Sequence, residues 1–207
     1  MPYPNFLVRL WLTFTLTLAR AYPATAGFPK RGLCYNDAAY IQNWNEPSSQ
    51  VNWAYNWGSA MDANFPDYLE YVPMLWSGNA GNWFANVNDA KARGSGHLLA
   101  FNEPDQAAQA NMSPQEAVDA YRTYMMPYAN SMSLGAPAVS NALTGLPWLQ
   151  QFMALCTGCV IDFVPIHWYA GTDSYDYLYS YVADAAAIAN GRPLWITEVS
   201  VLPLLTL

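Results

Sequence analysis

Short apolar segments alternate with longer helical or polar segments along most of this chain. The apolar segments begin about every 20 to 35 residues, which is the spacing of strand–helix units. They are rich in Val, Leu, Ile, Phe, Trp and Tyr, as expected of strands buried on both faces. Alternation of this kind predicts an α/β fold with a parallel sheet, either doubly wound or closed as a barrel. The expected strands are 31–35, 51–57, 71–76, 97–103, 133–138, 161–169 and 194–199.

Several segments between these strands carry helix signals. Ser113-Pro-Gln-Glu116 is a capping box with Pro at the first helical position, so we expect a helix from there to about Ser131. Residues 175–190 have helical spacing and are followed by Gly191, which is a typical end of a helix. Two further helices are expected at 82–93 and 146–156.

Polar residues gather where the expected strands end, and this distinguishes the two α/β architectures. The first strand is not followed by the Gly-x-Gly-x-x-Gly motif that a dinucleotide-binding fold carries there. Barrel enzymes build their sites at the carboxyl ends of the strands. We therefore predict a (β/α)8 TIM-type barrel, of which seven strands are recognisable. The residues at these ends are Asn36, Asp37, Asn56, Trp57, Trp76, Asn102, Glu103, His167, Trp168, Tyr169 and Glu198.

Two of these strands end in a glutamate. The fourth strand ends in Asn102-Glu103-Pro104, and the seventh ends in Glu198. Retaining glycosidases need a pair of carboxyl groups about 5 Å apart, one as nucleophile and the other as acid and then base. Strand ends across the mouth of a barrel can supply that distance. Glu103 and Glu198 are therefore the candidate catalytic pair.

Six motifs occur in one order along the chain. They are Arg31-Gly-Leu-Cys-Tyr-Asn36, Tyr55-Asn-Trp57, Pro73-Met-Leu-Trp76, Asn102-Glu-Pro-Asp105, Ile161-Asp-Phe-Val-Pro-Ile-His-Trp-Tyr169 and Trp195-Ile-Thr-Glu198. Together they resemble glycoside hydrolase family 128, the alkali-sensitive-linkage-type catalytic domains that include fungal β-1,3-glucanases. The resemblance extends from about Lys30 to Glu198.

The resemblance implies a retaining hydrolase of β-1,3-glucan that needs no cofactor and no metal. Glu103 would be the general acid/base and Glu198 the nucleophile. Asn102 would hydrogen-bond the sugar hydroxyl beside the reacting carbon. His167 and Tyr169 share strand parity, so both can face the site, and either could orient Glu198.

The tryptophans have two interpretations each. Trp57 and Trp76 are candidates for stacking on glucose rings, or for core packing. Trp195 alternates away from Glu198, so we expect it to pack against helices. Asp105 is expected to be a turn or capping residue. A non-catalytic glucan-binding protein of the cell wall is the alternative function, because aromatic residues would serve both functions.

Residues 1–26 have the pattern of a secretory signal peptide. Arg9 precedes the apolar run 10–19, and Ala24-Thr25-Ala26 fits the cleavage rule. A membrane anchor is the alternative, but Arg20 ends the apolar run well short of the roughly twenty residues of a span. We therefore expect a secreted protein, extracellular or in the cell wall, with no membrane association after cleavage.

The chain has a formal net charge of −7 and only eight Lys and Arg residues, two of them in the expected signal. Such a protein lacks the clustered basic residues that bind nucleic acid. We expect a monomer whose partner is a neutral β-glucan polysaccharide or oligosaccharide.

The barrel domain is expected to occupy residues 27–207 and to be C-terminally incomplete. The sequence ends nine residues after Glu198, and no eighth strand–helix unit can be recognised. Cys156 and Cys159 are a candidate local disulfide, with a zinc half-site or a redox pair as alternatives. Cys34 is then left over, either free or with a missing partner.

Overall fold

The structure is a computed structural model that describes residues 30–44 and 48–201. The expected signal peptide, residues 1–26, lies outside the described residues. Within the described part of the chain, every helix is too short or too polar to cross a membrane.

Each segment expected to form a strand contains or overlaps one in the structure. The strands are β1 (Arg31–Cys34), β2 (Val51–Tyr55), β3 (Glu70–Tyr71), β4 (His97–Leu98), β5 (Ser133–Leu134), β6 (Val164–Ala170) and β7 (Leu194–Val201). All pairings between them are parallel, and they form three groups, β1-β2-β3, β4-β5 and β6-β7. The sequence therefore predicts the position and direction of the strands well.

Isolated parallel bridges connect the three groups in chain order. One bridge joins Met74 to Leu99, between the segments that follow β3 and β4. Two others join Gly135 to Phe163 and Val139 to Ile166, and so connect the β5 and β6 segments. Among the described residues no hydrogen-bonded ladder links β1 to β7. The structure thus confirms the parallel α/β arrangement that the TIM-type prediction requires. It does not show a closed barrel among the described residues.

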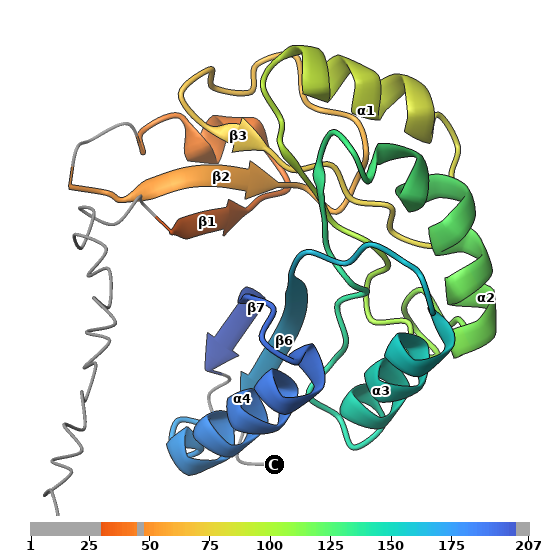
Figure 1. The fold of residues 1–207 in the computed structure, drawn as a ribbon. Coiled ribbons are helices and arrows are strands. Elements are labelled where there is room, and N and C mark those ends of the chain that lie inside the picture. The colour runs from red at the N-terminus through yellow and green to blue at the C-terminus, as the bar shows by residue number, and fades with distance from the viewer. Residues whose placement is uncertain (1–29, 45–47, 202–207) are drawn as a thin grey trace, which may run out of the picture.

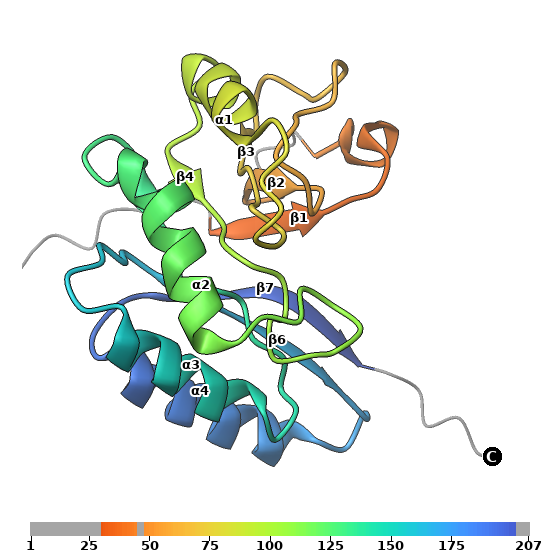
Figure 2. The same ribbon diagram turned by 90° about the vertical axis from the view of Figure 1, so that its right-hand side faces the viewer.

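In the described part of the chain, four α-helices form an arc around the outside of the strands (Figures 1 and 2). They are α1 (Trp83–Ala92), α2 (Pro114–Ala120), α3 (Gly145–Leu155) and α4 (Tyr175–Ala189). The expected positions of α1, α3 and α4 are confirmed to within one residue at each end. The helices bury apolar side chains against the strands because parallel strands must be covered on both faces. Fully buried members of this core include Trp83, Val87, Phe101, Tyr121, Leu134, Phe152 and Ile166.

The segment after the capping box differs from the expected long helix. The capping box itself is confirmed, since Ser113 and Glu116 accept each other's backbone N–H. The α-helix ends at Ala120, and a π-helical turn follows at Tyr121–Met125 before a 3-10 turn that contains Pro127. Proline has no N–H and its ring collides with the carbonyl one turn earlier, so a regular helix cannot continue through this position. The expectation of one helix to about residue 131 is wrong for this reason.

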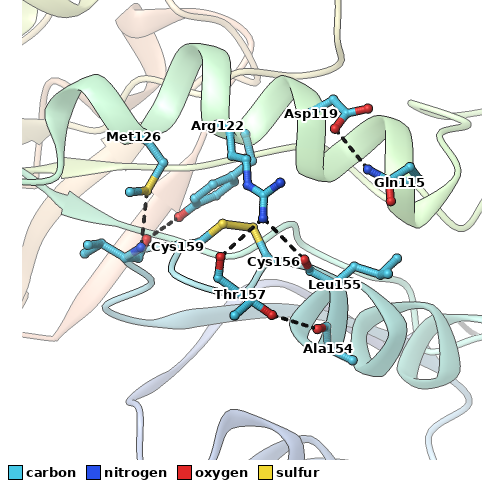
Figure 3. Close-up of a disulfide and its surroundings, with 11 residues drawn as sticks. Gln115, Asp119, Arg122, Met126, Ala154, Leu155, Cys156, Thr157 and Cys159 are labelled. Carbon is cyan, nitrogen blue, oxygen red and sulfur yellow. Dashed lines mark hydrogen bonds between the residues drawn. A yellow bond between two sulfur atoms is a disulfide. The ribbon is translucent and has the colours of Figure 1, made fainter.

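Cys156 and Cys159 form a disulfide in the loop after α3 (Figure 3). The Arg122 guanidinium reaches across from the π-helical turn and donates to the carbonyls of Leu155 (3.5 Å) and Thr157 (3.2 Å). The local disulfide, rather than a zinc half-site, is therefore what the structure shows. Cys34, at the end of β1, is a free and exposed thiol in the described part of the chain.

Candidate active site

The loop after β4 and the strands β6 and β7 bring two glutamates and a histidine together. One carboxylate oxygen of Glu103, one ring nitrogen of His167 and one carboxylate oxygen of Glu198 all lie within 4.8 Å of one another. These residues are separated by more than 30 positions in the sequence, so only the parallel arrangement of the strands makes them neighbours. Glu103 lies in the loop that follows β4, whereas Glu198 lies within β7, which continues past this glutamate to Val201.

Glu103 follows β4 in an unusual backbone conformation. Its φ of 43° lies in the left-handed region, which non-glycine residues rarely adopt. Its N–H donates to the carbonyl of Ala138 at 2.7 Å, which ties this turn to the segment after β5. The carboxylate Oε1 lies 2.9 Å from Nδ1 of the fully buried His167. Backbone and side-chain contacts together therefore fix Glu103.

A β-bulge in β7 turns Glu198 toward the site. Ile166 of β6 is opposite Ile196 of β7, but the next residue, His167, is opposite Glu198. The extra residue in β7 interrupts the strict alternation of side chains, as bulges near active sites often do. Trp195 and Glu198 consequently face the same side of the strand although they are three residues apart.

Trp195 corrects one expectation from the sequence. It packs inside the arc of strands, with its ring centroid 4.4 Å from that of Phe163, 4.9 Å from Trp53 and 5.1 Å from His97. The expectation that it packs against helices is wrong, because simple alternation does not hold across the bulge.

Four groups surround the Glu198 carboxylate. The indole N–H of Trp57 donates to Oε1 at 2.7 Å, and the Tyr55 hydroxyl lies 3.3 Å from the same oxygen. The Tyr169 hydroxyl donates to Oε2 at 2.7 Å, and Nδ1 of His167 lies 3.4 Å from that oxygen. Tyr169 is therefore the closer partner of Glu198, whereas His167 is closer to Glu103.

The two tyrosine hydroxyls near Glu198 remain protonated at any pH at which an enzyme works. Burial raises the pKa of Tyr55 and of Tyr169 far above its ordinary value, and the neighbouring Glu198 carboxylate raises both further. Both hydroxyls can thus act as hydrogen-bond donors throughout that range.

A polar pocket of about 340 Å³ opens above the two glutamates. Asn102 is buried in its wall and donates through Nδ2 to Gln109 Oε1 at 3.1 Å, while its Oδ1 has no partner among the described residues. Trp76 lines the same pocket and is 37% exposed, so one of its surfaces is open to a ligand. The complete lining is Asn36, Trp57, Trp76, Asn102, Glu103, Gln109 and Glu198.

Sequence reasoning missed two residues of this site, Tyr55 and Gln109. Tyr55 is the last residue of β2 and lies two positions before Trp57, so strand parity could have indicated that both face the same way. Gln109 lines the pocket from a loop, where no periodicity indicates the direction of a side chain. Asn36, expected at the end of the first strand, lines the pocket as well.

A larger cavity of about 790 Å³ lies at the opposite ends of the strands. It is lined by the first residues of β1, β2 and β7 and by the pair formed by His97 Nδ1 and Glu70 Oε1, which are 2.8 Å apart. Neither candidate catalytic glutamate reaches it. Since parallel α/β enzymes carry their chemistry at the carboxyl ends of strands, the smaller polar pocket is the candidate active site.

The Glu103–His167–Glu198 group is also the set of side chains that could hold a metal ion among the described residues. Both oxygens of Glu198, however, accept hydrogen bonds from Trp57 and Tyr169. Hydrogen bonds from N–H and O–H donors hold this carboxylate in one orientation. Such an arrangement suits a nucleophile better than a metal ligand.

Asp105 connects two loops beside the pocket. Its carboxylate accepts hydrogen bonds from the Ser140 backbone N–H (3.0 Å) and hydroxyl (2.6 Å), from Gln106 (2.7 Å) and from Thr144 (3.1 Å). This role agrees with the expectation of a turn residue.

Replacing Asp105 with Ala should destabilise the protein by about 1–3 kcal/mol, because the buried Ser140 groups lose their acceptor. Denaturant unfolding of both proteins measures this difference. Asp119→Ala, on the exposed face of α2, is the matched control and should change stability by less than about 0.5 kcal/mol. Equal stability of wild type and Asp105→Ala would contradict the assigned role.

Comparison with known proteins identifies the family of the chain. Residues 32–203 match the sequence family described as glycosyl hydrolase catalytic core. The chain belongs to this family. A family 128 (subgroup III) curdlan-specific exo-β-1,3-glucanase from Blastomyces gilchristii, solved with glucose, is 41% identical to it. The match covers 87% of this chain and 79% of that one, with a TM-score of 0.81.

Two further relatives place this glycosyl hydrolase core in family 128. An endo-β-1,3-glucanase from Amycolatopsis mediterranei, solved as a variant with laminaripentaose, is 32% identical over 86% of this chain and 73% of that one (TM-score 0.69). Alkali-sensitive linkage protein 1 of Schizosaccharomyces pombe is 35% identical over an alignment of 177 residues that covers 82% of this chain. The chain spans 31% of the length of that curated relative.

Proposed function

We propose that this family 128 domain is a secreted, retaining glycoside hydrolase that cleaves β-1,3-glucan by double displacement. The distance of at most 4.8 Å between carboxylate oxygens of Glu103 and Glu198 carries the proposal. Retaining enzymes have carboxyl groups about 5–5.5 Å apart, whereas inverting enzymes leave about 6.5–9.5 Å for a water molecule. The pair in this pocket fits the first arrangement.

The surroundings of the two carboxylates support different roles for them. Glu198 accepts hydrogen bonds on both oxygens, which fixes the plane of the group and suits a nucleophile that must attack in one direction. Glu103 has one close side-chain partner, His167, and faces the pocket, which suits a group that gives up and regains a proton.

The reaction then has two steps. In the first, Glu198 attacks the anomeric carbon while Glu103 gives its proton to the departing glycosidic oxygen. In the second, Glu103 takes a proton from water, which attacks the same carbon and releases Glu198. Asn102 lines the pocket, and its buried Oδ1 has no hydrogen-bond partner among the described residues, so this side chain would bind a hydroxyl of the reacting sugar.

The substrate class is supported by the relatives. The Blastomyces and Amycolatopsis enzymes are named as β-1,3-glucanases, and the second is solved with laminari-oligosaccharides. Trp76, exposed at the pocket, offers the aromatic surface on which a glucose ring can stack. The proposed secretion is based on the signal pattern of residues 1–26, and the proposed monomer on the chain's composition.

We extend the proposal to the barrel fold. We infer that the seven strands are part of a (β/α)8 barrel, supported by their chain-order, all-parallel arrangement and by the TM-score of 0.81. The outer edges of β1 and β7 carry no ladder in the described part of the chain. A binding protein without catalysis is less well supported, because binding alone does not require two carboxylates this close together.

The anomeric form of the first product tests the proposed mechanism. Proton NMR during hydrolysis of a laminari-oligosaccharide should show the β-anomer first and the α-anomer only later, by mutarotation. The α-anomer as first product would contradict double displacement and indicate inversion.

A further inference from the structure

Trp57 contacts Glu198 through its indole N–H. An indole N–H can only donate, and it donates to Glu198 Oε1 at 2.7 Å. The Tyr55 hydroxyl lies 3.3 Å from the same oxygen but equally close to the Thr197 carbonyl, so its single proton is shared between two acceptors. Trp57 is therefore the main hydrogen-bond donor to Oε1, and Tyr169 is the main donor to Oε2.

The backbone of Trp57 is in a conformation that disfavours a bulky residue. Its φ is 57°, in the left-handed region where glycine or asparagine is usual. Such outliers persist where the surrounding structure holds them, and they concentrate at functional sites. Glu103, with a φ of 43°, is a second outlier in the same pocket.

A hydrogen-bonded turn holds this backbone in place. Asn56 Oδ1 accepts from the Gly58 N–H at 3.0 Å and from the Tyr71 hydroxyl at 2.7 Å. Asn56 Nδ2 donates to the Ala60 carbonyl at 3.2 Å. The Trp57 ring also packs on Tyr55, with 5.2 Å between ring centroids. The indole is thus fixed before any ligand arrives.

We propose that Trp57 is a positioning residue, whose indole N–H fixes the Glu198 carboxylate in the orientation from which it attacks the sugar. A carboxylate can rotate about its last carbon–carbon bond, and one short donor on each oxygen stops that rotation. Fixed orientation of a nucleophile lowers the barrier without changing how tightly the substrate is held. The inference rests on the proposed function, and it goes beyond the sugar-stacking role expected of Trp57.

The test separates kcat from KM. Trp57→Phe keeps a ring on Tyr55 but removes the donor, so kcat on laminari-oligosaccharides should fall roughly ten- to a hundredfold while KM changes less than about threefold. Substituting benzothienylalanine, in which sulfur replaces the indole N–H, should lower kcat similarly with almost no change in shape. A raised KM at unchanged kcat would show that Trp57 acts as a stacking surface only, and would overturn the proposal.

A matched control uses a second tryptophan whose indole N–H donates a hydrogen bond. Trp148 donates its indole N–H to the Met112 carbonyl at 2.7 Å, on the helix α3 away from Glu198. Trp148→Phe loses an equivalent hydrogen bond, so its kcat per folded molecule should equal that of the wild type. An equal fall in kcat in both variants would mean that losing any such bond disturbs the enzyme, which overturns a specific role for Trp57.

A spectroscopic measurement tests the contact without activity. In protein labelled with ¹⁵N-tryptophan, the indole resonance missing from Trp57→Phe should move in Glu198→Ala, while the Trp148 resonance stays in place. A Trp57 resonance that does not move would overturn the inference and leave the glucanase proposal intact. A wild type that fails to hydrolyse β-1,3-glucan would overturn both.

Discussion

Replacing Glu198 with Gln should lower kcat on laminari-oligosaccharides by at least about a thousandfold, because an amide oxygen is too weak a nucleophile to form the glycosyl–enzyme bond. Gln has nearly the same shape as Glu and can still accept the Trp57 N–H, so the pocket should remain assembled. Initial rates by chromatography of the products measure the loss.

A binding measurement and a matched control substitution complete this test. The Kd of Glu198→Gln for laminarihexaose, measured by calorimetry, should stay within about threefold of the value for another inactive variant, Glu103→Gln. Glu116→Gln, at the exposed capping box of α2, should keep the wild-type kcat. A Glu198→Gln protein with more than a tenth of the wild-type kcat would contradict its assignment as the nucleophile.

Replacing Glu103 with Gln should slow glycosylation by about 10²–10⁴-fold for substrates with poor leaving groups, because the proton donor is lost. Aryl β-laminaribiosides that leave as weakly basic phenolates need little protonation, so their first step should be nearly normal. Their second step still lacks the base, and a burst of phenolate followed by slow turnover is expected.

Stopped-flow measurement of phenolate release over a series of leaving groups checks this prediction. The slope of log rate against leaving-group pKa should be steeper for Glu103→Gln than for the wild type. An equal loss of rate with every leaving group would contradict the acid/base assignment.

The sequence predicts the strands of this fold better than the contacts between them. Buried parallel strands require continuous apolar residues, so 161–169 and 194–199 are recognisable from composition alone. Helix α2 begins at a capping box, but its end at Ala120 depends on how the following backbone adapts to Pro127, which has no N–H. Whether β1 and β7 are joined is a long-range property that local patterns do not contain.

The sequence likewise predicts some features of the candidate site and not others. Glu103 and Glu198 could be found because each closes an apolar segment of the sequence, and parallel strands bring such segments to one edge. The bulge before Glu198 could not be found, since it depends on the register between β6 and β7. The N–H contact of Trp57 depends on a left-handed backbone that the residue itself disfavours, so propensity indicates the opposite of what the structure holds.

Release of reducing sugar from laminarin tests the central claim most directly. The protein without residues 1–26 should release sugar, while its Glu198→Gln variant, prepared and folded in the same way, should release almost none. Equal release by both proteins would contradict a reaction that depends on Glu198. No release by either would contradict the proposal that this chain is itself a β-1,3-glucanase.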